Sequence, residues 1–121
     1  MKKILLVEDD TFLADIYLTK FEEAGYDIKL ADNGEEGIKS AKQFKPDVLL
    51  LDIVLPKMNG LKVLSTLKKD SELKNIKVII LSNLGAEEDI NRAMELGADT
   101  YLIKSQYTPS EIVAEVEKVT K

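Results

Sequence analysis

The chain has 121 residues, of which 45% are hydrophobic and 32% charged, and its formal net charge is −5. This length fits one domain with one core, and the acidic balance disfavours binding nucleic acid through net charge. The sequence has no cysteine and no histidine, which excludes disulfides, cysteine nucleophiles, phosphohistidine and zinc sites built on these residues. No apolar run approaches the ~18 residues of a membrane span, and the four apolar residues that follow the two N-terminal lysines are too few for a signal peptide. We therefore expect a cytoplasmic protein without membrane contact.

Five short apolar runs predict five β-strands. They occupy residues 3–7, 27–31, 47–51, 77–81 and 100–103. Three of these runs are almost uninterrupted in apolar residues, which is typical of parallel strands that are covered on both faces.

The stretches between the runs are amphipathic, and apolar residues recur in them at the three- and four-residue spacing of helices. The sets are Phe12, Leu13, Ile16, Tyr17, Phe21 and Ala24; Ile90, Ala93, Met94 and Gly97; and Ile112, Val113, Val116 and Val119. Gly25 and Gly97 each follow a helical pattern where a left-handed residue is needed, so they mark helix ends. In "TPSE", residues 108–111, Thr108 and Glu111 form a predicted capping box at the start of the last helix.

Strands that alternate with helices predict an α/β fold, a three-layer sandwich with right-handed crossovers. The commonest open arrangement at this length is a flavodoxin-like, five-stranded parallel sheet in the order 2-1-3-4-5 with five helices. Neither a linker nor a shift in composition divides the chain. We therefore expect a single domain over residues 1–121, with no effector domain in this chain.

Polar residues follow the carboxyl ends of four predicted strands. Ligands of such sheets bind at this edge, where the strand order reverses. The residues are Glu8, Asp9 and Asp10 after the first strand, Asp52 after the third, Ser82 and Asn83 at the fourth, and Lys104 after the fifth.

Asp9, Asp10 and Asp52 are expected to converge at this edge. Clustered carboxylates repel one another, and a hard divalent cation relieves the repulsion. Oxygen ligands without imidazole or thiolate favour Mg²⁺. An aspartate carboxylate is also an established phosphoryl acceptor, and Lys104 and Ser82 are placed to hold the phosphoryl oxygens.

Each residue also has a simpler interpretation. Taken alone, Asp9 and Asp10 are at least as well explained as caps of a helix that starts near Thr11. Asp52, Ser82 and Asn83 fit turn positions, Lys104 fits a solvated lysine, and Tyr101 fits the core. Only their joint position at one edge of the sheet favours a phosphoryl and metal site.

The chain resembles a response-regulator receiver domain of two-component signalling, similar to the single-domain chemotaxis regulators, over essentially its full length. The matching residues are the acidic pair Asp9 and Asp10, the phosphoacceptor position Asp52, Pro56 and Gly60 after it, Ser82, Tyr101 and Lys104. The segment "GADTYLIK", residues 97–104, is similar to the fifth-strand segment of the family.

The resemblance implies that Asp52 accepts a phosphoryl group from a histidine kinase or phosphotransfer protein of a phosphorelay. It further implies Mg²⁺ bound by Asp10, Asp52 and the backbone carbonyl of Val54, and by Asp9 through water. A receiver of this kind is not an enzyme, although Mg²⁺-dependent self-phosphorylation from small phosphodonors and self-dephosphorylation are expected.

The resemblance also implies a switch. Lys104 binds one phosphoryl oxygen, Ser82 moves to bind another, and Tyr101 turns into the space that Ser82 leaves. The face of the fourth helix, fifth strand and fifth helix changes as a result. A downstream protein target or a phosphorylation-dependent homodimer reads that face, without direct contact to nucleic acid.

Two residues depart from the family pattern. The family usually has a cis-bonded proline after the lysine, where this chain has Ser105. A cis bond to a non-proline residue costs ~3–4 kcal/mol, so this loop is either trans or strained. The family usually has a small residue after the hydroxyl, where this chain has Asn83.

Two other functions compete with a phosphorylated receiver. A phosphohydrolase of the haloacid-dehalogenase type needs a second acid two residues after its aspartate, and that position is Val54. The more serious alternative is a degenerate receiver that acts as a phosphorylation-independent docking module. The clustered acids argue against it, because a docking module has no need to tolerate them, whereas Asn83 and Ser105 keep it open.

Overall fold

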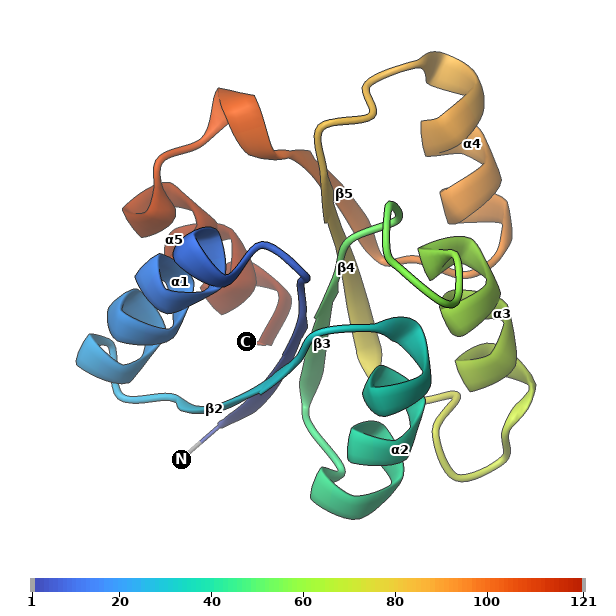
Figure 1. Ribbon diagram of the computed structural model, residues 1–121, viewed down its shortest axis with the longest axis horizontal. Coiled ribbons are helices and arrows are strands. Elements are labelled where there is room, and N and C mark those ends of the chain that lie inside the picture. Colours follow the sequence, from blue (N-terminus) through green and yellow to red (C-terminus); the bar gives the residue numbers. More distant parts are fainter. Residues whose placement is uncertain (1, 121) are drawn as a thin grey trace.

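The structure, a computed structural model, describes residues 2–120 as a central sheet with helices on both faces (Figure 1). The strands are β1 (Lys3–Val7), β2 (Asp27–Ala31), β3 (Val48–Leu51), β4 (Lys77–Ser82) and β5 (Thr100–Ile103). They are parallel, in the order β2-β1-β3-β4-β5. The predicted fold class is therefore confirmed. Two strands depart from the predicted bounds: β3 begins one residue later than predicted, and β4 ends one residue later.

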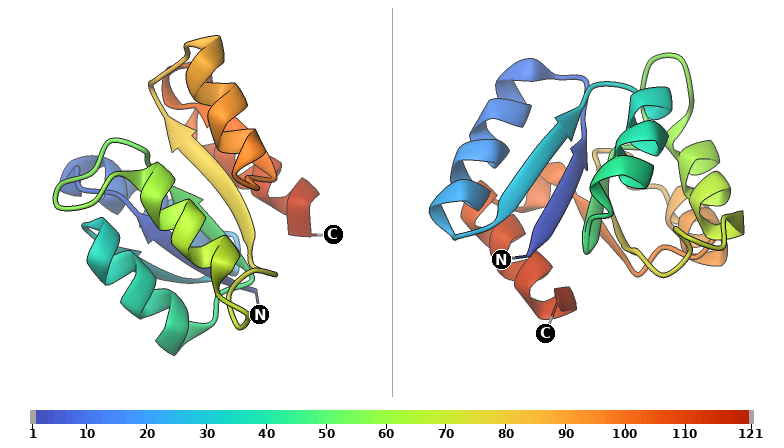
Figure 2. Two further views of the ribbon diagram at one scale, coloured as in Figure 1. Left: turned by 90° about the vertical axis from the view of Figure 1, so that its right-hand side faces the viewer. Right: turned by 90° about the horizontal axis from the view of Figure 1, so that it is seen from below.

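Helices α1 and α5 cover one face of the sheet, and α2, α3 and α4 cover the other (Figure 1 and Figure 2). The helices are α1 (Thr11–Glu23), α2 (Gly34–Phe44), α3 (Gly60–Lys69), α4 (Glu87–Glu95) and α5 (Pro109–Thr120), with the 3₁₀ helix η1 (Lys104–Gln106) after β5. Among the residues described, no helix is long and apolar enough to cross a lipid bilayer.

The core has two layers, one on each side of the sheet. Successive strand side chains point to opposite faces, so Ile4 and Leu6 pack under α1 and α5, whereas Leu5 and Val7 pack under α2 and α3. Both sets are almost fully buried. This burial on both faces explains why the strands are continuous apolar runs.

The predicted helix boundaries rest on local chemistry, and the structure confirms them. Gly25 and Gly97 have φ angles of +89° and +110°, in the left-handed region that ends a helix. In the capping box, the Thr108 N–H donates to Glu111 at 2.8 Å and the Glu111 N–H donates to Thr108 Oγ1 at 3.2 Å.

Two large side chains of the predicted apolar helix faces are exposed. Phe12 is 73% exposed and Met94 is 43% exposed, whereas Tyr17 and Phe21 on α1 are buried. Helix α1 begins at the edge where β1 ends, so its first turn has little sheet beneath it (Figure 1). Periodicity therefore predicts the helix correctly but overestimates the buried part of its face.

Candidate functional site

The carboxyl ends of β1, β3, β4 and β5 line one depression at the predicted edge of the sheet. Its lining residues are Glu8, Asp9, Asp10, Asp52, Val54, Ser82, Asn83, Leu84 and Lys104. Four separate segments of the chain thus contribute polar groups to one place, as expected from the parallel topology.

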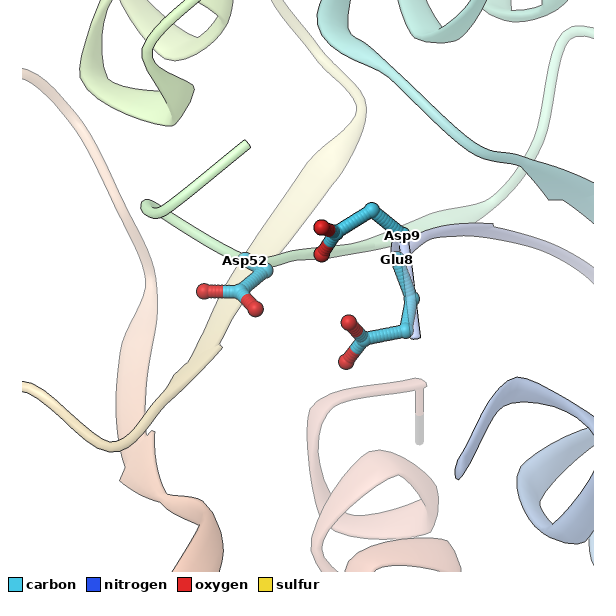
Figure 3. Close-up of side chains that lie close together, drawn as sticks. All are labelled: Glu8, Asp9 and Asp52. Carbon is cyan, nitrogen blue, oxygen red and sulfur yellow. The ribbon is translucent and has the colours of Figure 1, made fainter. Parts of the chain in front are cut away.

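An acidic cluster at the centre consists of Glu8, Asp9 and Asp52, and one carboxylate oxygen from each lies within 4.8 Å of those from the other two (Figure 3). Backbone hydrogen bonds continue the sheet into these residues. The Glu8 N–H donates to the Ala31 carbonyl at 3.0 Å, and the Asp52 N–H donates to the Val7 carbonyl at 3.2 Å. Glu8 is 2% exposed and Asp52 is 7% exposed. The sheet itself therefore sets two buried carboxylates side by side.

Lys104 partly compensates this negative charge. Its ammonium donates to Asp52 Oδ2 at 2.8 Å and also to Glu8 Oε1. Burial lowers the pKa of Lys104, but its hydrogen bonds and charge pairing with both carboxylates outweigh this effect, and the pKa lies above its ordinary value. The ammonium therefore stays charged. A buried carboxylate needs such a charged partner, because burying an unpaired charge is costly.

Glu8 is the least exposed acid of the cluster. Burial raises its pKa, against the lowering influence of Lys104 and of the Asp10 N–H, which donates to Glu8 Oε2 at 3.1 Å. Desolvation disfavours the ionised carboxylate more than these partners favour it.

The structure places Asp10 outside the acidic cluster, contrary to the prediction from the sequence. Asp10 is the N-cap of α1, and its Oδ1 accepts the Leu13 N–H at 3.1 Å. The simpler interpretation of Asp10 as a helix cap is thus the one that the structure supports. Glu8 takes the place in the cluster that was predicted for Asp10.

A signal for Glu8 was present in the sequence. The register pairs Val7 with Leu51 across β1 and β3, so the next residues, Glu8 and Asp52, stand level with each other. Once this register is known, counting forward from the two apolar runs identifies Glu8 as the neighbour of Asp52.

Ser82 and Tyr101 contact the same loop. Ser82 is 1% exposed, and its Oγ accepts the Leu84 N–H at 3.2 Å. The Tyr101 hydroxyl donates to the Leu84 carbonyl at 2.5 Å. Tyr101 is half-buried, and burial raises the pKa of its hydroxyl. The backbone of Leu84 thus links the two predicted switch residues.

The loop after β3 holds Asp52 from the other side. The Val54 N–H donates to Asp52 Oδ1 at 3.1 Å, and the Gly60 N–H donates to the Ile53 carbonyl at 2.8 Å. A Cβ at Gly60 would lie 2.2 Å from the Asp52 carbonyl oxygen. Only glycine, which has no Cβ, allows the two backbone segments to approach this closely, and this explains why residue 60, in the loop after Pro56, is glycine.

The loop after β5 contains Ser105, at the position where the family usually has a cis-bonded proline. No peptide bond within residues 2–120 is cis, so the bond between Lys104 and Ser105 is trans. Of the two geometries left open by the sequence, the trans form is therefore present.

The donor atoms of the acidic cluster fit a hard divalent cation. Glu8, Asp9 and Asp52 offer carboxylate oxygens alone, and Asp9 is solvent-exposed, which leaves room for the waters that Mg²⁺ retains. Lys104 supplies one positive charge against three carboxylates, so the cluster keeps a net negative charge.

Comparison with known proteins agrees with this geometry. A family model of the response regulator receiver domain matches residues 4–117. The DNA-binding dual master transcriptional regulator RpaA of Synechocystis sp. is 35% identical over 121 residues, which are 100% of this chain and 50% of RpaA. The chemotaxis protein CheY of Thermotoga maritima is 31% identical over 121 residues, which are 99% of this chain and 98% of CheY.

Solved structures give the same result. The Mn²⁺-bound form of the response regulator Rcp1 matches with a TM-score of 0.86 and 27% identity, over 98% of this chain and 93% of Rcp1. The chain spans about half the length of RpaA and of the transcriptional regulatory protein PhoP of Bacillus subtilis, and nearly all of CheY. The chain belongs to the family of response regulator receiver domains of two-component signalling.

Proposed function

We propose that this receiver domain is a phosphorylation-activated switch whose phosphoacceptor is Asp52 and whose phosphodonor is a histidine kinase or phosphotransfer protein. One observation carries the proposal. A buried aspartate, a lysine ammonium 2.8 Å from its Oδ2 and a buried serine hydroxyl open into the same acidic depression. An acceptor, a cation for the phosphoryl oxygens and a hydroxyl donor are the parts that phosphoryl transfer to a carboxylate requires.

The residues that would hold Mg²⁺ are Asp9 and Asp52, with Glu8 beside them and the Val54 carbonyl as the predicted backbone ligand. Asp10 is not retained as a ligand because its carboxylate caps α1. When bound, Mg²⁺ neutralises negative charge on the transferring phosphoryl oxygens. The support for this ion is the oxygen-only donor set.

Phosphoryl transfer follows from the position of Asp52. One of its carboxylate oxygens attacks phosphorus, and the bond from phosphorus to the donor breaks with its electron pair leaving on the donor. The broken bond is to nitrogen in phosphohistidine and to oxygen in acetyl phosphate, and the product is an acyl phosphate on Asp52. Lys104 is already charged beside the acceptor, so its contribution needs little rearrangement at the moment of reaction.

The switch follows from the bonds to Leu84. The Ser82 hydroxyl proton can donate to a phosphoryl oxygen, and a shift of Ser82 toward that oxygen loosens its bond to the Leu84 N–H. The carbonyl of the same residue holds Tyr101. A displaced loop therefore changes the environment of Tyr101 and, with it, the face of α4, β5 and α5.

We propose that a downstream protein or a second copy of the chain recognises this face in the cytoplasm. Direct binding of nucleic acid or membrane is not part of the proposal. The proposal includes self-phosphorylation by small phosphodonors and self-dephosphorylation, but no turnover of another external substrate.

The test is incubation with acetyl phosphate, with and without Mg²⁺, followed by intact-mass spectrometry. We expect a Mg²⁺-dependent gain of one phosphate that the Asp52→Asn variant lacks. No gain, under conditions that label a control receiver, would instead support the degenerate docking module.

A further inference from the structure

A side chain joins the loops that follow β4 and β5. The Ser105 N–H donates to Asn83 Oδ1 at 3.0 Å. Backbone pairing between these strands extends as far as Ser82 and Ile103. The Asn83 amide therefore adds a connection just beyond the last pair of the sheet.

This connection lies next to two groups that the proposed function uses. Asn83 directly follows Ser82, and Ser105 directly follows Lys104. Asn83 and Lys104 also line the same depression as Asp52. The bond between Asn83 and Ser105 therefore directly joins the loop that follows Ser82 to the loop that begins with Lys104.

We propose that Asn83 is a positioning residue for phosphoryl transfer. Its side chain holds the start of η1 so that the Lys104 ammonium stays between Glu8 and Asp52. This inference rests on the proposed function for its kinetic consequence, whereas the placement of Lys104 does not depend on phosphate.

Lysine is a flexible side chain, and its charge is effective at a site only when its backbone is well placed. Lys104 lies in the first turn of a three-residue 3₁₀ helix, an element with poor internal hydrogen bonding. The Asn83 bond supplies support for this turn from outside it. Because Asn83 and Ser105 are both solvent-exposed, losing the bond is expected to change the site more than the stability of the fold.

The donor is a backbone N–H, which defines a matched pair of variants. Ser105→Ala keeps the N–H and removes only the hydroxyl, so it serves as the control. Ser105→Pro removes the N–H. Asn83→Ala removes the acceptor from the opposite loop.

The first measurement is the NMR signal of the Lys104 ammonium in metal-free, unphosphorylated protein, together with hydrogen exchange of the Ser105 amide. In Asn83→Ala we expect a shifted or broadened ammonium signal and faster Ser105 exchange, with an unchanged unfolding midpoint. Ser105→Ala should retain the wild-type ammonium signal.

The second measurement is the rate of labelling by acetyl phosphate at saturating Mg²⁺. Asn83→Ala should lower the apparent second-order rate constant about twofold to tenfold, the factor that corresponds to one neutral hydrogen bond. In a double-mutant cycle, Asn83→Ala should have little further effect in the Ser105→Pro background.

The outcomes separate this inference from the proposed function. A wild-type chain that takes no phosphate contradicts the proposed function. The Lys104 ammonium signal of Asn83→Ala then still tests whether Asn83 positions Lys104. A labelled wild-type chain, with Asn83→Ala labelled at the same rate and an unchanged Lys104 signal, overturns the positioning role.

Discussion

The Lys104 ammonium lies 2.8 Å from Asp52 Oδ2, although 52 residues separate the two in the sequence. The same ammonium also binds Glu8. This contact explains how the buried strand β3 can run directly into an acid, because a buried carboxylate is tolerated when a charged partner accompanies it. The contact also means that the stability of the site and its chemistry depend on the same cation.

Replacing Lys104 by methionine should therefore destabilise the metal-free protein. Two buried carboxylates lose their partner, and an unpaired buried group costs about 1–3 kcal/mol. Chemical unfolding in the presence of a chelator measures this loss. Lys118→Met is the matched control, since Lys118 pairs with Glu115 on the surface at 72% exposure, where solvent screening leaves an ion pair little effect on stability. Equal effects of the two variants would show that the Lys104 pairs contribute no more than a surface pair.

Asp9→Asn should stabilise the metal-free protein by up to about 1 kcal/mol, because it relieves repulsion within the acidic cluster without removing a partner of Lys104. The gain should shrink as Mg²⁺ is added, since the variant loses a ligand. Thermal unfolding across a Mg²⁺ titration measures both effects. Asp15→Asn changes the net charge equally from an exposed position on α1, and it should show neither response.

The pH dependence of stability should reveal Glu8. Its pKa is raised in the folded state, first by burial. Between about pH 4.3, the ordinary pKa of glutamate, and the raised value, the folded state binds more protons than the unfolded state. The contribution of Glu8 to the free energy of unfolding therefore falls as the pH rises through this window.

Glu8→Gln isolates this contribution, because the other acids remain. The difference in unfolding free energy between wild type and Glu8→Gln, from urea titrations in a chelator, should decrease with rising pH across the window. Parallel pH profiles of the two proteins would mean that Glu8 titrates as it does in the unfolded chain.

Gly60→Ala should destabilise the protein by about 1–3 kcal/mol, the usual range for overpacking. The added methyl group meets the Asp52 carbonyl oxygen, a backbone atom that cannot move away cheaply. Gly85→Ala is the control, since a Cβ there first meets the flexible end of Ile103 at 3.2 Å. If both variants unfold at the same urea concentration, the loop after β3 is less constrained than the close approach indicates.

The fold, and the edge of the sheet at which the depression lies, could be predicted from the sequence alone. Val48–Leu51 is apolar at every position because both faces of the strand are buried, and this pattern identifies a central parallel strand. The helix end at Gly97 and the capping box of Thr108 and Glu111 could be predicted from the sequence, because each depends on local backbone chemistry.

Which acids meet depends on packing between segments that are distant in the sequence. Glu8, Asp9 and Asp10 are adjacent and chemically similar, so composition and spacing do not distinguish the helix cap from the members of the acidic cluster. The choice depends on where β1 stops relative to β3 and where α1 begins, both of which are set by packing between distant segments. The contact between Asn83 and Ser105 arises in the same way, because a hydrogen bond between two loops exists only once the sheet has brought their strands together.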